Sequence, residues 1–320
     1  MVLLRTSKGK LKGVSVLGKV VTMPNNSSRH LILGTRALHS ENYASAVAHL
    51  EKAFKEAPDF EVAKLLVAAE NGLKQPQEAV AYLSEYMEDF LSSEIGTTTI
   101  YDTLLALPDY RFAWAVLHHV APTQKAEIQT RIETAEAKDL AAHADEINDL
   151  AKQLRHLGGF SAHEQESMLQ SLGRLPKAQL MASAATNLVD PDVHPAVRIS
   201  LLDALTAVGD DREVQVLGYQ TQGTVVPNVL PGVLSDPTLL AVLNQVQLQI
   251  GLNDPELMKA TVETLRFELG YLYPFIDKAI DDPKHFAASY LHQESNTVTP
   301  AERALFNWLQ QQTGKLMDMA

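Results

Sequence analysis

The spacing of small, large apolar and proline residues near the start of the chain constrains its fold most strongly. Gly34 lies twelve residues before Ala46. Leu50 and Ala53 follow Ala46 at helical spacing, which places the three side chains on one helix face. Pro58 comes next, where proline would end a helix. Other prolines also cluster where helices would stop, so the sequence favours many short helices joined by tight turns.

The first 34-residue unit, from about residue 27, resembles the tetratricopeptide repeat, a helix-turn-helix motif. In that family a small residue of the first helix faces a small residue early in the second, and Gly34 and Ala46 match these places. A second unit places Ala68 34 residues after Gly34 and predicts an inter-helix turn one residue shorter. The repeat-signature positions are Leu33, Gly34, Ala46, Leu50, Ala53, Pro58, Ala68, Ala79 and Leu83. The resemblance implies a helical array over about 27–96.

The rest of the array and the connecting segment follow from apolar spacing and breakers. Residues 97–122 suit either a degenerate third unit or a capping one, since terminal repeats are usually atypical. The segment 123–157 lacks proline and glycine, which predicts one long amphipathic helix ending at Gly158 and Gly159. We therefore predict four parts: a basic N-terminal arm over 1–26, a repeat array over 27–122, a connecting helix over 123–158 and a C-terminal helical domain over 159–320.

The C-terminal half reads as further helices with one β-hairpin. Ser161 and Glu164 form a capping-box pattern at a helix start. Alternating residues predict two short strands near 213–218 and 223–227, within a hairpin near 213–227. Four helices are predicted to begin beside Asp-Pro or Thr-Pro signals, near 237–250, 254–272, 283–292 and 299–315. The expected fold is all-α, with a tetratricopeptide-like array followed by a solenoid-like helical region.

Two stretches of this half, VVPNVLPGV and YLYPF…FAASYLHQ, resemble a group of Gram-positive bacterial proteins with N-terminal tetratricopeptide repeats. The resemblance implies this layout and no chemistry.

The residue patterns of common catalytic sites are missing. There is no cysteine, no G-x-G-x-x-G and no G-x-x-x-x-G-K-[ST]. His285 and His292 would share a helix face, but no third ligand lies between them, so packing is the simpler interpretation. Asp190, Asp192 and His194 imitate the start of a calcium loop, yet proline follows where that loop needs glycine. We expect a protein that is not an enzyme and holds no cofactor or metal.

The charge of the chain limits the classes of molecule that it can be expected to bind. The net charge of −12 and the pI of about 5.4 argue against DNA binding, which needs clustered Lys and Arg. No apolar stretch is long enough for a membrane helix, and we expect a cytoplasmic location. However, seven basic residues precede the first acid, Glu41. This arm suits contact with RNA, a ribosome or an anionic surface, although a solvated tail or a short strand around Val14 to Val21 also fits.

Aromatic residues near the end of the array could contact a partner or belong to the core. The candidates for contact are Tyr82, Tyr86, Tyr101 and Trp114. Some tetratricopeptide proteins grip a C-terminal carboxylate with Lys and Asn, but the corresponding positions here are Leu31, Thr35, Leu65 and Ala69. The expected function is a non-catalytic scaffold or adaptor that binds a protein or peptide segment in the helical-repeat groove. The alternative is an RNA- or ribosome-associated factor that uses the basic arm.

Overall fold

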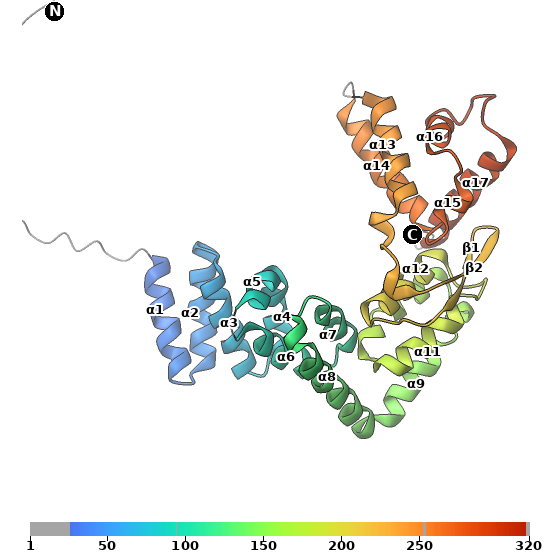
Figure 1. Ribbon diagram of the computed structural model, residues 1–320. Coiled ribbons are helices and arrows are strands. Elements are labelled where there is room, and N and C mark those ends of the chain that lie inside the picture. Colours follow the sequence, from blue (N-terminus) through green and yellow to red (C-terminus); the bar gives the residue numbers. More distant parts are fainter. Residues whose placement is uncertain (1–25, 94, 252–253, 318–320) are drawn as a thin grey trace, which may run out of the picture. The chain divides into compact units, whose positions relative to one another are not determined.

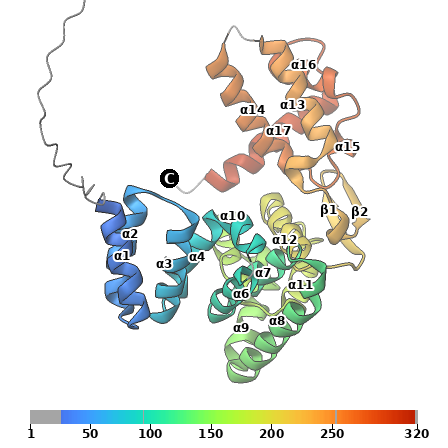
Figure 2. The same ribbon diagram turned by 60° about the vertical axis from the view of Figure 1, so that its left-hand side comes forward.

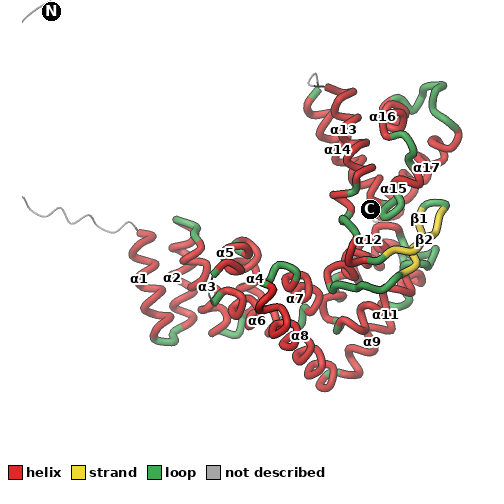
Figure 3. The backbone as a smooth tube through the Cα atoms, viewed as in Figure 1, coloured by secondary structure: helices red, strands yellow, loops and turns green. Residues whose placement is uncertain are grey.

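A computed structural model describes residues 26–93, 95–251 and 254–317, and over these residues the fold is all-α as predicted (Figures 1 and 3). Within this described part, the sheet structure is one two-stranded hairpin. The predicted basic arm and the alternative N-terminal strand fall on residues outside it. The chain forms two compact units that divide between Tyr82 and Leu83. The predicted boundaries at 122 and 158 stay predictions.

The first unit is a stack of antiparallel helices: α1 (Asn26–His39), α2 (Tyr43–Glu56), α3 (Phe60–Gly72) and the start of α4 (Pro76–Glu85). Helix α2 packs between α1 and α3 (Figures 1 and 2). Ala46, Leu50 and Ala53 are fully buried in its core. A Cβ atom on Gly34 would lie 2.6 Å from the Leu50 Cγ atom, so only glycine permits this approach of α1 to α2. The close contact expected from the repeat pattern is therefore present.

The two helix pairs repeat with an offset of 33 residues, not the predicted 34. Glu41 and Lys74 both adopt left-handed backbone, with φ of 57° and 59°. The Asn42 N–H donates to the Ala37 carbonyl at 2.9 Å, and the Gln75 N–H donates to the Glu70 carbonyl at the same distance. Three residues separate the helices in each pair, so the expectation of a shorter second turn is wrong.

This offset changes which residue of α3 corresponds to Gly34. Val67 is fully buried and lies twelve residues before the buried Ala79, as Gly34 lies before Ala46. Ala68 is exposed. Its assignment as a packing position is wrong, because one residue is about 100° of rotation on a helix and moves a side chain to another face.

The second unit begins with eight described helices. They are α5 (Met87–Ser92), α6 (Gly96–Ala106), α7 (Tyr110–Leu117), α8 (Pro122–Ala142), α9 (Ala144–Leu154), α10 (Ala162–Leu169), α11 (Lys177–Asn187) and α12 (Pro195–Ala207). Helices α5 to α9 pack in chain order, whereas α9 packs next against α11, and α10 and α11 both pack against α12. Short 3-10 turns lie at Leu157–Gly159 (η1) and Leu172–Arg174 (η2). Ser161 and Glu164 form the predicted capping box at the start of α10.

The single helix predicted over 123–157 is divided in two at His143. The backbone of His143 is not helical, with φ of −130° and ψ of 36°. Its ring nitrogen lies 2.7 Å from a carboxylate oxygen of Asp139, and Asp139 also accepts hydrogen bonds from Arg174 and Tyr110. Helix α8 packs against α6 and α7, whereas α9 packs against α11. The prediction failed because this change of packing partner leaves no glycine or proline signal in the sequence.

The predicted hairpin is present as β1 (Val214–Gly218) and β2 (Thr221–Val225), which pair antiparallel with Val214 opposite Val225. The second strand begins two residues earlier than predicted, because a two-residue turn at 219–220 joins the strands. Two 3-10 turns follow, η3 (Pro227–Val229) and η4 (Val233–Ser235). Figure 3 shows this stretch between helical segments.

The four predicted C-terminal helices are confirmed, and a short helix was not foreseen. They are α13 (Pro237–Ile250), α14 (Pro255–Gly270), α16 (Pro283–Leu291) and α17 (Pro300–Met317), with the extra α15 (Ile276–Ala279). The carboxylates of Asp236, Asp254 and Asp282 accept hydrogen bonds from first-turn N–H groups, as N-caps do. Helix α13 packs against α14 and α16, and α17 packs against α14, α16 and α10. Contacts of α17 and α14 with the α10–α12 segment create the sites described next.

Candidate functional site

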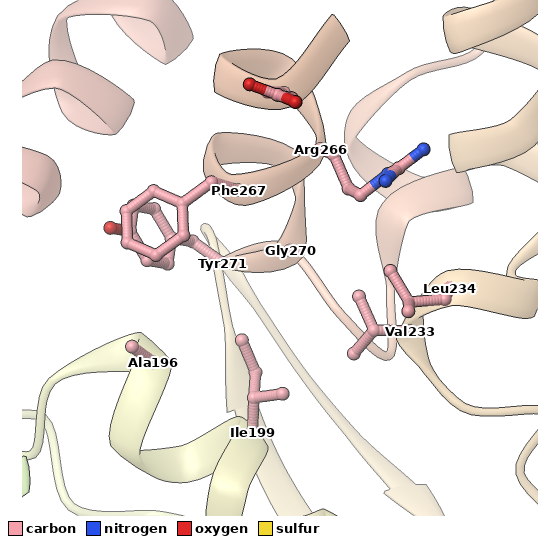
Figure 4. Close-up of a pocket in the computed structure, with 9 residues that line it drawn as sticks. Ala196, Ile199, Val233, Leu234, Arg266, Phe267, Gly270 and Tyr271 are labelled. Carbon is pink, nitrogen blue, oxygen red and sulfur yellow. The ribbon is translucent and has the colours of Figure 1, made fainter. Parts of the chain in front are cut away.

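An apolar pocket of about 340 Å³ lies between α12, η4 and α14 in the second unit (Figure 4). Helix α12 contributes Ala196 and Ile199, and η4 contributes Val233. Helix α14 and the residue after it contribute Gly270 and Tyr271. The sequence forms the pocket locally because Gly232, with φ of 76°, turns the chain into η4 just before Val233.

The apolar lining continues onto the surface at the rim of the pocket. Leu234 of η4 is 65% exposed and Phe267 of α14 is 47% exposed. The Phe267 ring meets the buried Tyr271 ring edge-on, with centroids 5.2 Å apart, so its orientation is fixed. Glu263 and Arg266 are the charged residues beside it, and both are exposed. An exposed apolar rim around an apolar hollow is typical of a surface that another molecule covers.

The lining of the pocket is mostly apolar and holds few titratable groups. Apart from the Tyr271 hydroxyl, whose pKa burial raises, its titratable groups are the two exposed side chains Glu263 and Arg266. Catalysis by proton transfer needs an acid or base aimed at a reacting atom in the site. The lining instead offers shape and apolar area, which stabilise a bound apolar side chain by about 25 cal/mol per Å² buried.

The aromatic residues predicted to contact a partner divide into two groups. Tyr101 is fully buried and its hydroxyl donates to the Ala113 carbonyl. Trp114 is 5% exposed, and its indole N–H donates to Glu136 at 2.7 Å. Both therefore belong to the core, and their interpretation as partner contacts is wrong. Tyr82 and Tyr86 are half-buried, and their role as contacts stays a prediction.

Three of the other titratable groups singled out in the sequence, His285, Asp190 and His194, have structural partners. His285 lies 3.4 Å from Glu302, which belongs to the first turn of α17. A carboxylate oxygen of Asp190 accepts from the Asp192 N–H, and His194 is the N-cap of α12. Among the residues described, no three His, Cys, Asp or Glu side chains gather as ligands for a metal ion.

Comparison with known proteins identifies no relative: no protein-family model, curated protein or solved structure matches the chain. Over the described residues, no helix combines the length and apolarity that crossing a membrane requires.

Sequence reasoning missed the pocket entirely. The segment around Val233 and Leu234 reads as a proline- and glycine-containing loop, and Phe267 fits the apolar pattern of its helix. The one available signal was the consecutive apolar residues at Val233 and Leu234 outside any predicted helix. Ile199 lies about 35 residues from Val233 and Leu234 and about 70 residues from Phe267 along the chain. A local sequence pattern does not encode packing between such distant segments.

Proposed function

We propose that this chain is a non-catalytic protein-binding scaffold, and that it holds an apolar side chain of a partner segment in the pocket between α12 and α14. The observation that carries the proposal is the apolar hollow whose rim, at Leu234 and Phe267, stays exposed. In many interfaces a few anchor residues packed into a central pocket supply most of the binding energy, and this pocket could receive such an anchor from a partner.

A protein segment suits this pocket better than a small molecule. Small-molecule sites bury most of the ligand and fix its orientation with a few placed polar groups. Here the polar groups lie at the rim, and the apolar surface extends outward past Phe267. Only a partner wider than the hollow covers that rim while inserting an anchor.

The charge of the chain adds a feature of the expected partner. The net charge of −12 favours association with a segment whose anchor is flanked by basic residues, because complementary charge steers encounter. Arg266 and Glu263 lie one helical turn apart at the rim, which would orient a segment carrying both signs of charge.

The groove of the repeat array is a second candidate surface for the same function. Helices α1 and α3 take the place of first helices, which line the binding face in repeat arrays. Ile32 of α1 is 55% exposed, while Leu31 and Thr35 are half-buried.

A pull-down with matched variants tests the proposal. The full chain would be immobilised and exposed to lysate of the cells that produce it, and bound proteins would be identified by mass spectrometry. We expect the double variant Leu234→Ser/Phe267→Ser to lose proteins that the native chain retains. The control Leu248→Ser/Leu257→Ser removes two leucines that are 67% and 52% exposed away from the pocket, and should retain them. Equal capture by the pocket variant would reject this pocket as the site.

The basic arm supports a second candidate function, contact with RNA or a ribosome. Arg5, Lys8, Lys10, Lys12 and Lys19 precede every acid of the chain. A chain lacking residues 1–20 should then lose capture of nuclease-sensitive material, and native capture should weaken steeply with salt. Capture that survives nuclease, high salt and the deletion would favour the scaffold.

A further inference from the structure

A second cavity, of about 500 Å³, also borders the N-terminal turn of α12. It is lined by the residues that precede α10 and α12 and by the C-terminal half of α17. Its character differs from the apolar pocket because buried polar side chains form its walls. Gln165, His194, Arg198 and Gln312 are all less than 9% exposed.

Arg198 is the central feature of this cavity. Its side chain is 8% exposed, and its one hydrogen bond within the described residues runs from Nη1 to the Asp190 carbonyl at 2.9 Å. A guanidinium carries several more N–H donors in a planar fork. Burial lowers the Arg198 pKa to about 10, and the charge of Asp190 opposes this effect without forming an ion pair with Arg198 among the described residues. No Arg198 nitrogen is among the fully buried polar atoms that lack a partner in the described residues, and Arg198 lines the cavity, so its remaining donors are open to an acceptor that enters it.

The cavity walls are held by hydrogen bonds that do not involve Arg198. The Gln165 amide nitrogen donates to the Phe160 carbonyl at 2.9 Å and to the Asp192 carbonyl at 3.0 Å. Its amide oxygen accepts from the His194 N–H at 2.8 Å. The two loops that border the cavity are thus tied by one buried side chain. The His194 ring then bonds to the Gln312 carbonyl at 3.0 Å, which fixes α17.

The local electrostatic field suits an anion. Arg198 and Lys315 both lower the pKa of His194, after the larger effect of burial, which means that both place positive potential at this ring. The cavity is also lined by Ala162 and Pro195, the first residues of α10 and α12, where helix dipoles carry partial positive charge. Asp192 is the acidic residue of the lining.

The size and the aromatic residues of the cavity indicate more than a bare ion. Trp308 and Phe160 line it, and Phe160 is 41% exposed. The Trp308 ring packs on Tyr219 with centroids 4.9 Å apart, so one wall is a fixed aromatic surface. Planar carboxylates match the guanidinium fork and accept two parallel hydrogen bonds from it.

We propose that this cavity binds the carboxylate of a ligand with an apolar body, with Arg198 holding the carboxylate and Trp308 contacting the body. The carboxylate could belong to a free small acid or to the C-terminus of a peptide. The ligand chemistry is the same in both cases. This site is separate from the apolar pocket, and its failure would leave the proposed scaffold function untouched.

Titration of the full chain with defined probes tests the inference. Trp308 is one of two tryptophans in the chain, and the other, Trp114, lies in the core outside the cavity, so a fluorescence change that is lost in Trp308→Phe reports on the cavity. The probes are phenylacetate, its neutral amide phenylacetamide, inorganic phosphate, and a tripeptide ending in phenylalanine with a free or an amidated C-terminus. We expect saturable binding of phenylacetate or of the free-acid peptide, and at least tenfold weaker binding of the matching amide.

Variants separate recognition from folding. Arg198→Lys keeps the charge, removes the fork and should weaken binding at least tenfold. Lys315→Gln changes an exposed side chain, so it should fold normally and weaken binding severalfold. Arg155→Gln, at an exposed position in α9's C-terminal cap, is the matched control and should bind as the native chain does. Binding of neither carboxylate probe, binding of phosphate alone, or unchanged binding by both Arg198→Lys and Lys315→Gln would overturn the proposal.

Discussion

The repeat pair α1–α4 and the segment around α12 use their backbones in opposite ways. In the repeat pair, the two turns have a left-handed residue and a backbone hydrogen bond at corresponding places, and Gly34 allows the close approach of α1 to α2. Around α12, a 3-10 turn, a hairpin and loops of different length meet. Regular turns allow helices to fill the space between them, whereas dissimilar pieces leave hollows that side chains only line. The repeated helix pairs therefore form a regular stack, whereas the candidate sites lie among the irregular elements around α12.

The largest loss of stability is expected from a substitution in the repeat pair, at the contact of α1 with α2. Gly34→Val places side-chain atoms against Leu50, and we expect the first unit to lose about 3 kcal/mol of unfolding free energy through overpacking. Ala68→Val, 34 residues later at an exposed position, should cost about 0.5 kcal/mol from helix propensity alone. Hydrogen exchange of α1–α3 amides would measure both. Equal losses would contradict the 33-residue offset.

Replacing Gln165 should lower the stability of the segment around α12. Gln165→Leu leaves two carbonyls and the His194 N–H without their buried partner, and we expect a loss of about 2 kcal/mol. Urea denaturation followed by tryptophan fluorescence would measure it. Gln153→Leu, an exposed position in α9, is the control and should change stability little. If both variants unfold alike, Gln165 does not hold the loops together.

Lowering the pH should destabilise the segment around α12, because His194 becomes protonated. Its Nδ1 atom accepts from the Ala196 N–H, which requires a neutral ring, and burial lowers its pKa below 6.5. The folded state therefore takes up the proton less readily than the unfolded chain. The stabilisation from neutral His194 should therefore be fully present above pH 6.5 and be lost as the pH falls from 6.5 toward the lower pKa of the folded state.

The matching variant is His194→Asn, which keeps a capping acceptor and does not titrate. Denaturation of both proteins between pH 5 and 8 would show a shallower pH dependence for the variant. Parallel curves would mean that other groups, and not His194, cause the dependence.

The smallest effect on stability is expected at the rim of the apolar pocket. Leu234→Ser and Phe267→Ser remove side chains that are largely or half exposed, so each should change the unfolding free energy by less than about 1 kcal/mol. Thermal denaturation provides the measurement. A larger loss from either substitution would show that the rim is part of the core and weaken the proposed binding role.

The sequence by itself determined where most helices begin and that one hairpin interrupts them. N-caps such as Asp236 and Asp282 act on N–H groups two or three residues away, so the signal and its structure are local. The same holds for the turn of the hairpin and for glycine at the α1–α2 contact.

The tertiary structure alone decided which faces are buried and which groups meet. Val67, and not Ala68, occupies the buried packing position, although both residues fit the apolar pattern of α3. Helix α8 stops at His143 because the chain changes packing partners there. The hydrogen bond between His194 and Gln312 joins residues 118 positions apart. Burial and such distant contacts depend on the sum of many weak interactions across the fold, and no short stretch of sequence records that sum.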